Sequence, residues 1–383
     1  MALFKTPEYT LIGSKALEEA KPYLKKCGKK ALIVTGKHVV LSDMMAELKK
    51  ALEEIGIAYF IFDGITGEPT NVMIDEGIAA YKENGCDFCI GIGGGSPLDS
   101  AKAIAAMITN EGKIADYNGK VIEKPIPPVV AIPTTAGTGS EATQFTVITD
   151  VEKDIKMLLK GGYLVPKIAI VDPAYTYSAP KSITAATGMD ALTHAIEAYT
   201  SRKALPVTDT LAVSAVKRIM KYLPAAYKDG SDEKARYEMS VASYEAGICI
   251  NNSTVTLVHG MSRPIGALFH VAHGISNAML LTKCLAFALD GAYEKFANLG
   301  REIGVATAED DDKTASEKFI EALNEICKIC EIPTLLEYGI PKDEFFAHME
   351  KMAHDALTSG SPGNTMKPIS EQDIIEIYKK LWE

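Results

Sequence analysis

The strongest constraint on the fold is an alternation of strand-like and helix-like segments along the first half of the chain. Five short runs are rich in β-branched residues, nearly continuously apolar, and end in Gly, Pro or Asp. They cover residues 30–36, 58–64, 87–95, 128–135 and 167–173. Segments with helical character lie near 14–26, 41–55, 71–84 and 97–109. Apolar strands separated by helices predict βαβ units and a parallel sheet that is buried on both faces.

The pattern changes after residue 182. From 183 to 383 the Ala-, Leu- and Glu-rich sequence has helical periodicity and no convincing strand. Residues 145–161 precede this change and resemble a hairpin with charged residues at its turn. We therefore predict two domains, a parallel-sheet α/β domain over 1–182 and an all-helical domain over 183–383. A chain of 383 residues with 47% hydrophobic content is long enough to bury two such cores.

Charge and cysteine content exclude several classes of protein. The net charge of −10 leaves no basic excess to neutralise nucleic-acid phosphates or an anionic membrane surface. The N-terminal residues lack the pattern of a secretory signal, and no apolar run is long enough to cross a bilayer. Seven cysteines, an odd number, fit a reduced protein better than a disulfide scaffold. We expect a cytoplasmic protein that binds neither nucleic acid nor membranes.

A glycine-rich loop follows the strand-like run at 87–95 and leads into a helix. In GGGSPLDSAK, residues 93–102, the glycines let the backbone turn tightly and approach a ligand. The free N–H groups of the helix N-terminus favour a phosphate, and Lys102 is placed to reach a phosphate or ribose oxygen. Ser96 breaks the GxGxxG fingerprint, and the loop follows the third predicted strand. By itself the loop therefore predicts an anion site, with a capped βα turn as the alternative.

A second loop of small polar residues follows the next predicted strand. The segment IPTTAGTGSEAT, residues 132–143, contains two glycines and a run of hydroxyl groups. The carboxyl ends of adjacent parallel strands are the usual place for a cofactor in an open α/β sheet. The two loops together therefore predict a cofactor site.

Candidate metal ligands lie in two segments of the helical half. Within GMDALTHAIEAYT, residues 188–200, an Asp and a His lie one helical turn apart, which is also typical of a solvated helix face. Three of the seven histidines lie within VHGMSRPIGALFHVAHG, residues 258–274. The candidate ligands are Asp190, His194, His259 and His273. One carboxylate oxygen and three imidazole nitrogens suit Fe(II) or Zn(II), but spacing alone supports a metal site and a structural role equally.

Four segments together resemble the signature segments of the iron-containing (group III) alcohol dehydrogenases, in the dehydroquinate synthase-like superfamily. They are GGGSPLDSAKAIA, PTTAGTGSEAT, ATGMDALTHAIEAY and HGMSRPIGALFHVAHG, in this order. The resemblance covers essentially the whole chain. It implies a Rossmann-like dinucleotide-binding domain, then a helical metal-binding and substrate domain, with the active site in the cleft between them. It also implies NAD(P)-dependent hydride transfer between small alcohols or diols and their aldehydes, and a homodimer or larger homo-oligomer.

The resemblance also implies roles for individual residues. The family's metal ligands match Asp190, His194, His259 and His273, with iron(II) favoured over zinc(II). Its pyrophosphate and ribose contacts match Gly94, Gly95, Ser96, Asp99 and Lys102. Its loop beside the adenosine and nicotinamide matches Thr134, Thr135, Thr138 and Ser140. Glu197 matches no ligand position, and we expect it to support or orient a ligand.

Two positions depart from the family pattern. Many members have a carboxylate after the first strand that accepts from the ribose 2′-OH, whereas this chain has Gly36 followed by Lys37. A 2′-phosphate would meet no repulsion there and would gain a cation, so we predict that NADP(H) is accepted and favoured over NAD(H). Arg263 stands where many relatives have a further histidine, and arginine cannot act as a base at neutral pH. His270 is then the candidate proton relay.

The main alternative is a metalloenzyme that performs no redox chemistry. It would be a lyase of the dehydroquinate-synthase-like type, or a hydrolase that acts on a phosphorylated substrate with metal-bound water. Such a protein would bind metal but reduce no nicotinamide with any alcohol. A non-catalytic scaffold would leave the dispersed ligands and both loops unexplained. The sequence names no individual alcohol or aldehyde.

Overall fold

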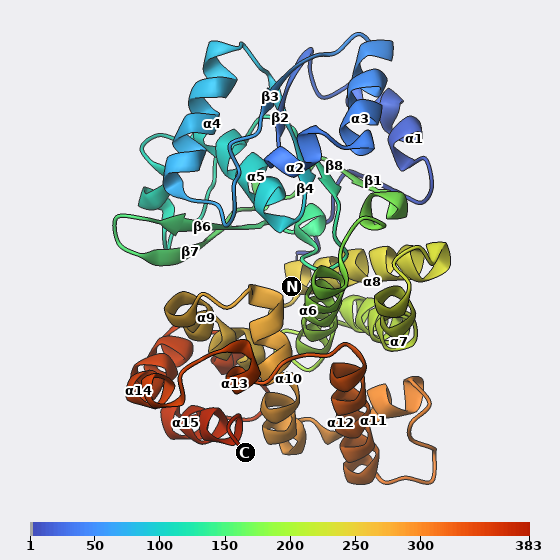
Figure 1. Ribbon diagram of the computed structural model, residues 1–383, viewed down its shortest axis with the longest axis vertical. Coiled ribbons are helices and arrows are strands. Elements are labelled where there is room, and N and C mark those ends of the chain that lie inside the picture. The colour runs from blue at the N-terminus through green and yellow to red at the C-terminus, as the bar shows by residue number, and fades with distance from the viewer. Residues whose placement is uncertain (1–2) are drawn as a thin grey trace. The chain divides into compact units, whose positions relative to one another are not determined.

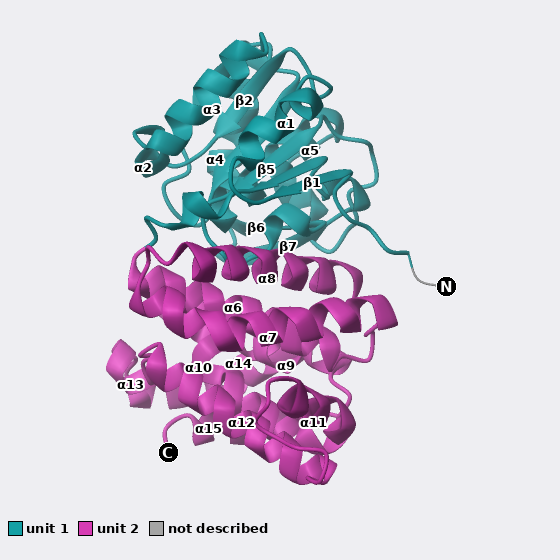
Figure 2. Ribbon diagram, turned by 90° about the vertical axis from the view of Figure 1, so that its right-hand side faces the viewer, with its two compact units in different colours: residues 1–179 teal, residues 180–383 magenta. Residues whose placement is uncertain are grey.

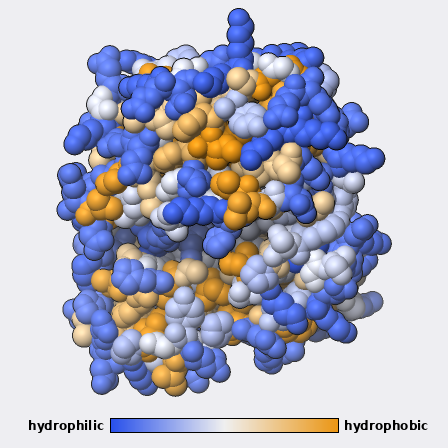
Figure 3. All heavy atoms as spheres, turned by 45° about the horizontal axis from the view of Figure 1, so that its top comes forward, coloured by the Kyte–Doolittle hydropathy of each residue, from blue (hydrophilic) through white to orange (hydrophobic). Residues whose placement is uncertain are grey.

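The computed structural model describes residues 3–383 and divides into two compact units (Figure 2). The first unit ends at Ala179 and the second begins at Pro180, whereas the sequence placed the boundary between residues 182 and 183. On the face drawn in Figure 3, hydrophilic residues predominate and hydrophobic residues form separate groups. Within the described part of the chain, no helix combines the length and apolar character needed to span a membrane.

A six-stranded sheet forms the centre of the first unit (Figure 1). Its strands are β1 (Tyr9–Ile12), β2 (Lys30–Val34), β3 (Ala58–Phe62), β4 (Phe88–Gly93), β5 (Val129–Pro133) and β8 (Ile168–Val171). They lie in the order β1-β8-β5-β4-β2-β3, and every pair is parallel. The predicted parallel sheet is thus confirmed. The sequence missed β1, because this four-residue edge strand contains two polar residues and has no fully buried side chain.

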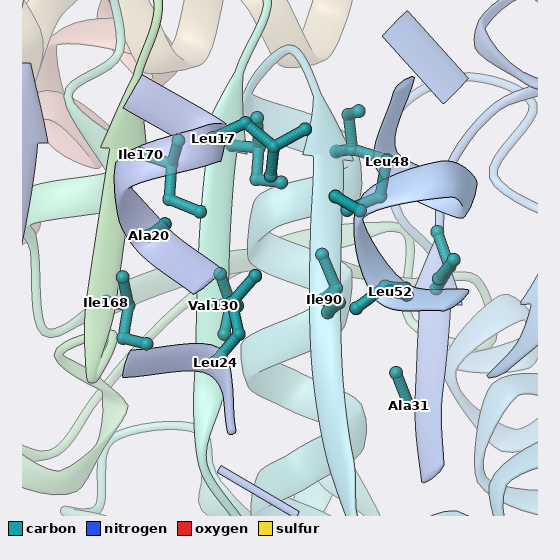
Figure 4. Close-up of a cluster of buried hydrophobic side chains, with 14 of the residues drawn as sticks. Leu17, Ala20, Leu24, Ala31, Leu48, Leu52, Ile90, Val130, Ile168 and Ile170 are labelled. Carbon is teal, nitrogen blue, oxygen red and sulfur yellow. The ribbon is translucent and has the colours of Figure 1, made fainter. Parts of the chain in front are cut away.

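Helices cover both faces of this sheet. They are α1 (Ala16–Leu24), α2 (Lys37–Val40), α3 (Asp43–Glu54), α4 (Asn71–Glu83) and α5 (Gly95–Thr109). One face packs against α1 and α3 through the cluster drawn in Figure 4. Its labelled side chains are Leu17, Ala20, Leu24, Ala31, Leu48, Leu52, Ile90, Val130, Ile168 and Ile170. A second cluster, which includes Ile74 of α4 and Ile104 of α5, packs with Leu32 and Val34 of β2. This two-sided burial explains why the strands read as continuous apolar runs.

The remaining elements of the first unit are short. The predicted hairpin is confirmed as β6 (Phe145–Asp150) and β7 (Ile155–Lys160), which pair antiparallel. Four 3₁₀ helices complete the unit: η1 (Ile114–Tyr117), η2 (Ser140–Ala142), η3 (Gly162–Leu164) and η4 (Pro173–Thr176).

The strand order places Gly36 and the glycine-rich loop, two of the candidate cofactor segments, at one point of the sheet. The chain runs from β2 to β3 on one side and returns to β4 on the other side of β2. Such a reversal is a topological switch point, where the carboxyl ends of the strands leave room for a ligand. Gly36 follows β2 and the glycine-rich loop follows β4, so the two segments flank this switch point.

The second unit is all-helical, as predicted, since residues 180–383 contain no β-strand. Its first helices are α6 (Lys181–Tyr199), α7 (Pro206–Lys228), α8 (Glu233–Asn252), α9 (Leu257–Phe269) and α10 (His273–Ala288). They are followed by η5 (Leu289–Gly291), α11 (Tyr293–Glu302), α12 (Asp312–Ile329), α13 (Leu335–Tyr338), α14 (Lys342–Thr358), η6 (Pro362–Asn364) and α15 (Glu371–Lys380). Helix α6 contacts α7, α8 and α10, and every residue from Gly188 to Tyr199 is buried. Its polar residues therefore do not form a solvated face.

Candidate functional site

Four candidate metal ligands meet where α6, α9 and α10 pack together. Ligand atoms of Asp190, His259 and His273 all lie within 4.8 Å of one another. Asp190 Oδ1 is 3.7 Å from Nε2 of each of these two histidines. His194 Nε2 is 3.9 Å from the same oxygen, and its ring stacks on that of His259 with centroids 4.6 Å apart. Asp190 of α6 thus faces the same point as His259 of α9 and His273 of α10, and His194 lies beside them.

The side chain of Asn277 tests whether this point fits a cation. Asn277 Nδ2 donates to Asp190 Oδ1 at 2.7 Å, and it lies 3.1 and 3.2 Å from Nε2 of His259 and His273. An amide has two hydrogens, so it cannot satisfy three converging acceptors. Asn277 Oδ1 is buried and accepts no hydrogen bond within residues 3–383. The site therefore has more lone pairs than hydrogen-bond donors. A divalent ion would accept such lone pairs, so this set of ligand atoms fits a divalent ion.

Glu197, one helical turn after His194 on α6, fixes the orientation of one candidate ligand. His259 Nδ1 lies 2.6 Å from Glu197 Oε2, and Oε1 accepts from Thr256 Oγ1 at 2.7 Å and from the Val258 N–H at 2.6 Å. Burial opposes ionisation of Glu197, but His259 and these hydrogen bonds outweigh it and lower the pKa of the carboxyl. The carboxylate therefore holds a proton on His259 Nδ1 and leaves the Nε2 lone pair free to ligate. This is the orienting contact expected from the sequence.

The pKa shifts of two members of the cluster suit a ligand set, whereas Glu197 and Asp190 outweigh burial and raise the pKa of His259. Burial would raise the pKa of Asp190, but the imidazoles of His194, His273 and His259 outweigh burial and hold this pKa well below its usual value. For His273, whose side chain is 46% exposed, partial loss of solvation and the neighbouring imidazoles lower the pKa despite the attraction of Asp190. Asp190 is therefore anionic and His273 neutral at neutral pH, the forms that bind a metal.

The two cofactor loops of the first unit touch each other. Thr134 N donates to the Gly93 carbonyl at 2.8 Å. A Cβ added at Gly95 would lie 2.9 Å from Thr138 Cγ2, so only glycine allows this approach without a shift. Gly94 is the N-cap of α5 and has no side chain to cap the first N–H groups. These N–H groups are available to an anion.

Asp99, Lys102 and Ser140 form a buried network beneath these loops. Lys102 is fully buried, and its Nζ donates to Ser140 Oγ at 2.8 Å, Thr143 Oγ1 at 3.2 Å and the Phe145 carbonyl at 3.0 Å. Ser140 Oγ in turn donates to Asp99 Oδ1 at 2.5 Å. An ammonium group has three hydrogens, all of which are engaged here. Lys102 thus ties α5 to the second loop, and its predicted contact with a cofactor oxygen stays a prediction.

We expect Lys102→Met to lower the free energy of unfolding by about 3 kcal/mol, because it leaves the half-buried Asp99 and the buried Glu141 without their counter-charge. Asp99 Oδ1 lies 3.8 Å from Nζ, and Glu141 is also buried nearby. Urea unfolding followed by circular dichroism measures the change. Lys120→Met removes an exposed lysine of the same unit and should change stability little. Equal stability of the two variants would contradict the role assigned to Lys102.

The remaining predicted site residues lie at element ends. Gly36 is the N-cap of α2, and Lys37, its first residue, is exposed. Ser96 and Thr135 are half-buried within the glycine-rich loop and the second loop. His270 is exposed and caps the C-terminus of α9 in the left-handed conformation, with φ of 53°. Its role as a proton relay stays a prediction.

Comparison with known proteins decides the family. Residues 7–173 match the family described as iron-containing alcohol dehydrogenase, and residues 184–382 match the C-terminal part of the Fe-containing alcohol dehydrogenase family. The chain belongs to the iron-containing alcohol dehydrogenases. It is therefore an oxidoreductase, and the dehydrogenase interpretation is favoured over the non-redox alternative.

Relatives of this dehydrogenase cover its full length. It is 38% identical to the NAD-dependent methanol dehydrogenase of Bacillus methanolicus over 99% of each chain. It is 36% identical to the 1,3-propanediol dehydrogenase of Klebsiella pneumoniae over 92% of this chain and 91% of the relative. The crystal structure of a 1,3-propanediol oxidoreductase superposes with a TM-score of 0.95 at 34% identity, covering 100% of both chains. The alcohol dehydrogenase from Oenococcus oeni gives 0.95 at 30% identity, also covering 100% of both.

Proposed function

We propose that this enzyme interconverts small alcohols or diols and their aldehydes, with NAD(P) as the hydride carrier and a divalent metal as the second cofactor. The observation that carries the proposal is the convergence of Asp190, His259 and His273 on one point of the helical unit, with His194 Nε2 3.9 Å from Asp190 Oδ1. Relatives named methanol and 1,3-propanediol dehydrogenases support short alcohols and diols as a starting panel. We also propose a homodimer or larger homo-oligomer, which analytical ultracentrifugation tests.

We propose iron(II) rather than zinc(II) as the metal, held by Asp190, His194, His259 and His273. When bound, the ion supplies Lewis acidity toward an alcohol or carbonyl oxygen, and the nicotinamide accepts or supplies the hydride. Glu197 keeps the Nδ1 proton on His259 and so directs its Nε2 lone pair toward the ion. The carboxylate of Asp190 is held ionised and would contribute one negative charge to the ligand set.

We propose that the first unit binds the dinucleotide at its switch point. Gly94, Gly95 and Ser96 would let the backbone of the glycine-rich loop approach the pyrophosphate, beside the free N–H groups of α5. Thr134, Thr135 and Thr138 would offer hydroxyl groups from the second loop. Asp99, Lys102 and Ser140 would hold the two loops at a fixed separation.

The cofactor preference is tested at Gly36. We propose NADP(H) as the favoured cofactor, because Gly36 offers no carboxylate to repel a 2′-phosphate and Lys37 is exposed beside it. Gly36→Asp should lower the ratio of kcat/KM for NADP to that for NAD by about 10-fold or more. A Cβ at this position would lie 2.9 Å from the Ile65 carbonyl oxygen, so Gly36→Ala is the matched steric control. A strong NAD preference that neither variant alters would contradict the proposal.

Two measurements on the purified protein test the function as a whole. Elemental analysis of protein purified without air identifies the metal, and iron is the expected result. A panel of short alcohols, diols and aldehydes, assayed with both nicotinamide cofactors, identifies the reaction. Protein that retains metal but transfers no hydride with any of these compounds would overturn the proposal in favour of a non-redox metalloenzyme.

A further inference from the structure

Arg263 brings a positive charge to the edge of the candidate metal centre. It follows His259 by four residues on α9, so the two side chains leave the same face of the helix. The residue is half-buried, and one nitrogen of its guanidinium donates to Ser361 Oγ at 2.9 Å.

This charge has no counter-ion in the structure. Within residues 3–383, no carboxylate lies within ion-pair distance of Arg263, and Ser361 is its one recorded hydrogen-bond partner. Burial lowers the pKa of the guanidinium, while Glu197 acts in the opposite direction. Both Glu197 oxygens are already engaged by His259, Thr256 and Val258. A guanidinium stays charged, so most of its five N–H donors lack the anionic acceptor that offsets desolvation.

We propose that Arg263 binds an anionic group of the substrate, so that the enzyme prefers short aldehydes or alcohols that carry a terminal carboxylate, sulfonate or phosphate. The planar fork of arginine matches two oxygens of any of these groups. An anion held by Arg263 would lie one helical turn along α9 from His259, so the substrates that fit would be short. This inference rests on the proposed dehydrogenase function and assigns Arg263 as its specificity-determining residue.

The experiment compares aldehydes of two to four carbons in matched pairs. One member carries a terminal carboxylate, sulfonate or phosphate, and the other an uncharged group of similar size. In at least one pair, the unmodified enzyme should show a higher kcat/KM for the anionic member than for the neutral member. Comparison of the carboxylate, sulfonate and phosphate substrates then identifies the preferred anionic group. Arg263→Gln should lower kcat/KM for that substrate about 100-fold and change its neutral partner less than about threefold. Arg263→Lys, which keeps the charge without the fork, should lose less.

Control measurements separate the possible failures. Arg301→Gln, which removes a cation that pairs with Asp312 elsewhere in the helical unit, should leave the substrate preference unchanged. The inference is overturned if neutral substrates are preferred, or if Arg263→Gln lowers kcat/KM equally for both members of a pair. It is also overturned if the variant raises only the KM of the nicotinamide cofactor, because Arg263 would then contact a cofactor phosphate. Absence of hydride transfer with every compound would instead refute the proposed function.

Discussion

Replacing His259 or His273 by alanine is expected to abolish metal retention and turnover together. Each variant removes one imidazole from the four candidate metal ligands, and each leaves Asp190 with one imidazole fewer beside it. Because the proposed ion would provide the Lewis acidity of the reaction, kcat/KM should fall by more than about 1,000-fold. Elemental analysis after desalting and steady-state kinetics on the same sample measure both effects.

His354 supplies a matched control for the two ligand variants. It is an exposed histidine of the same unit whose Nδ1 lies 3.3 Å from Glu371, away from the four candidate ligands. His354→Ala should therefore retain metal and activity. A His259→Ala protein that is fully active without metal would refute the ligand assignment. Unaltered metal content in both ligand variants would do the same.

Glu197→Gln is expected to weaken metal binding by about 10- to 100-fold, although it changes no ligand. The carboxylate accepts from His259 Nδ1, Thr256 Oγ1 and the Val258 N–H. A glutamine must turn its NH₂ group toward one of these sides. An NH₂ group turned toward Val258 would face the N–H of that residue, which is also a donor. An NH₂ group turned toward His259 would donate to Nδ1 and favour the tautomer with its proton on Nε2, and that nitrogen could then not ligate a metal. Competition with a chelator of known affinity measures the change.

A second glutamate separates this effect from the general cost of the substitution. Glu245 on α8 is half-buried and accepts from Ser214 Oγ at 2.9 Å, so Glu245→Gln makes the same chemical change elsewhere in the helical unit. It should leave the metal affinity unaltered. If Glu197→Gln binds metal as tightly as the unmodified enzyme, Glu197 does not orient His259. A smaller effect for Glu197→Asp, which keeps the charge, would support the orienting role.

The extent to which the fold was predictable follows from burial. Strands β2, β4, β5 and β8 read clearly because almost all of their side chains are buried, which leaves an unbroken apolar pattern. Strand β1 lies at the sheet edge, pairs only with β8, and carries half-buried side chains. Its four residues give too short a signal to separate from a loop. The apolar pattern of the sequence therefore predicted the buried strands and the layers of the fold, but not the edge strand β1.

The candidate site was also predicted only in part. Histidine is scarce in this chain, so the spacing of Asp190, His259 and the other candidates drew attention to residues that the structure brings together. Asn277 was missed, although it follows His273 by four residues, the same helical spacing that flagged Asp190 and His194. Amides are common on helices, and only the fold shows that this one points at the ligands. The burial of Lys102 could not be predicted from the sequence either, because its hydrogen-bond partners lie about forty residues away along the chain.

The placement of the ligands on α6, α9 and α10 has a consequence for the lifetime of the protein in a cell. An ion held there would join α6 to α9 and α10, which lie much further along the chain. Binding only to the folded form adds about 2.7 kcal/mol of stability when free ion exceeds Kd a hundredfold, and none when ion is scarce. Under metal starvation the helical unit should open more often and become the first target of proteases, while the parallel sheet persists. Abundance of the enzyme would then follow metal supply without any change in its synthesis.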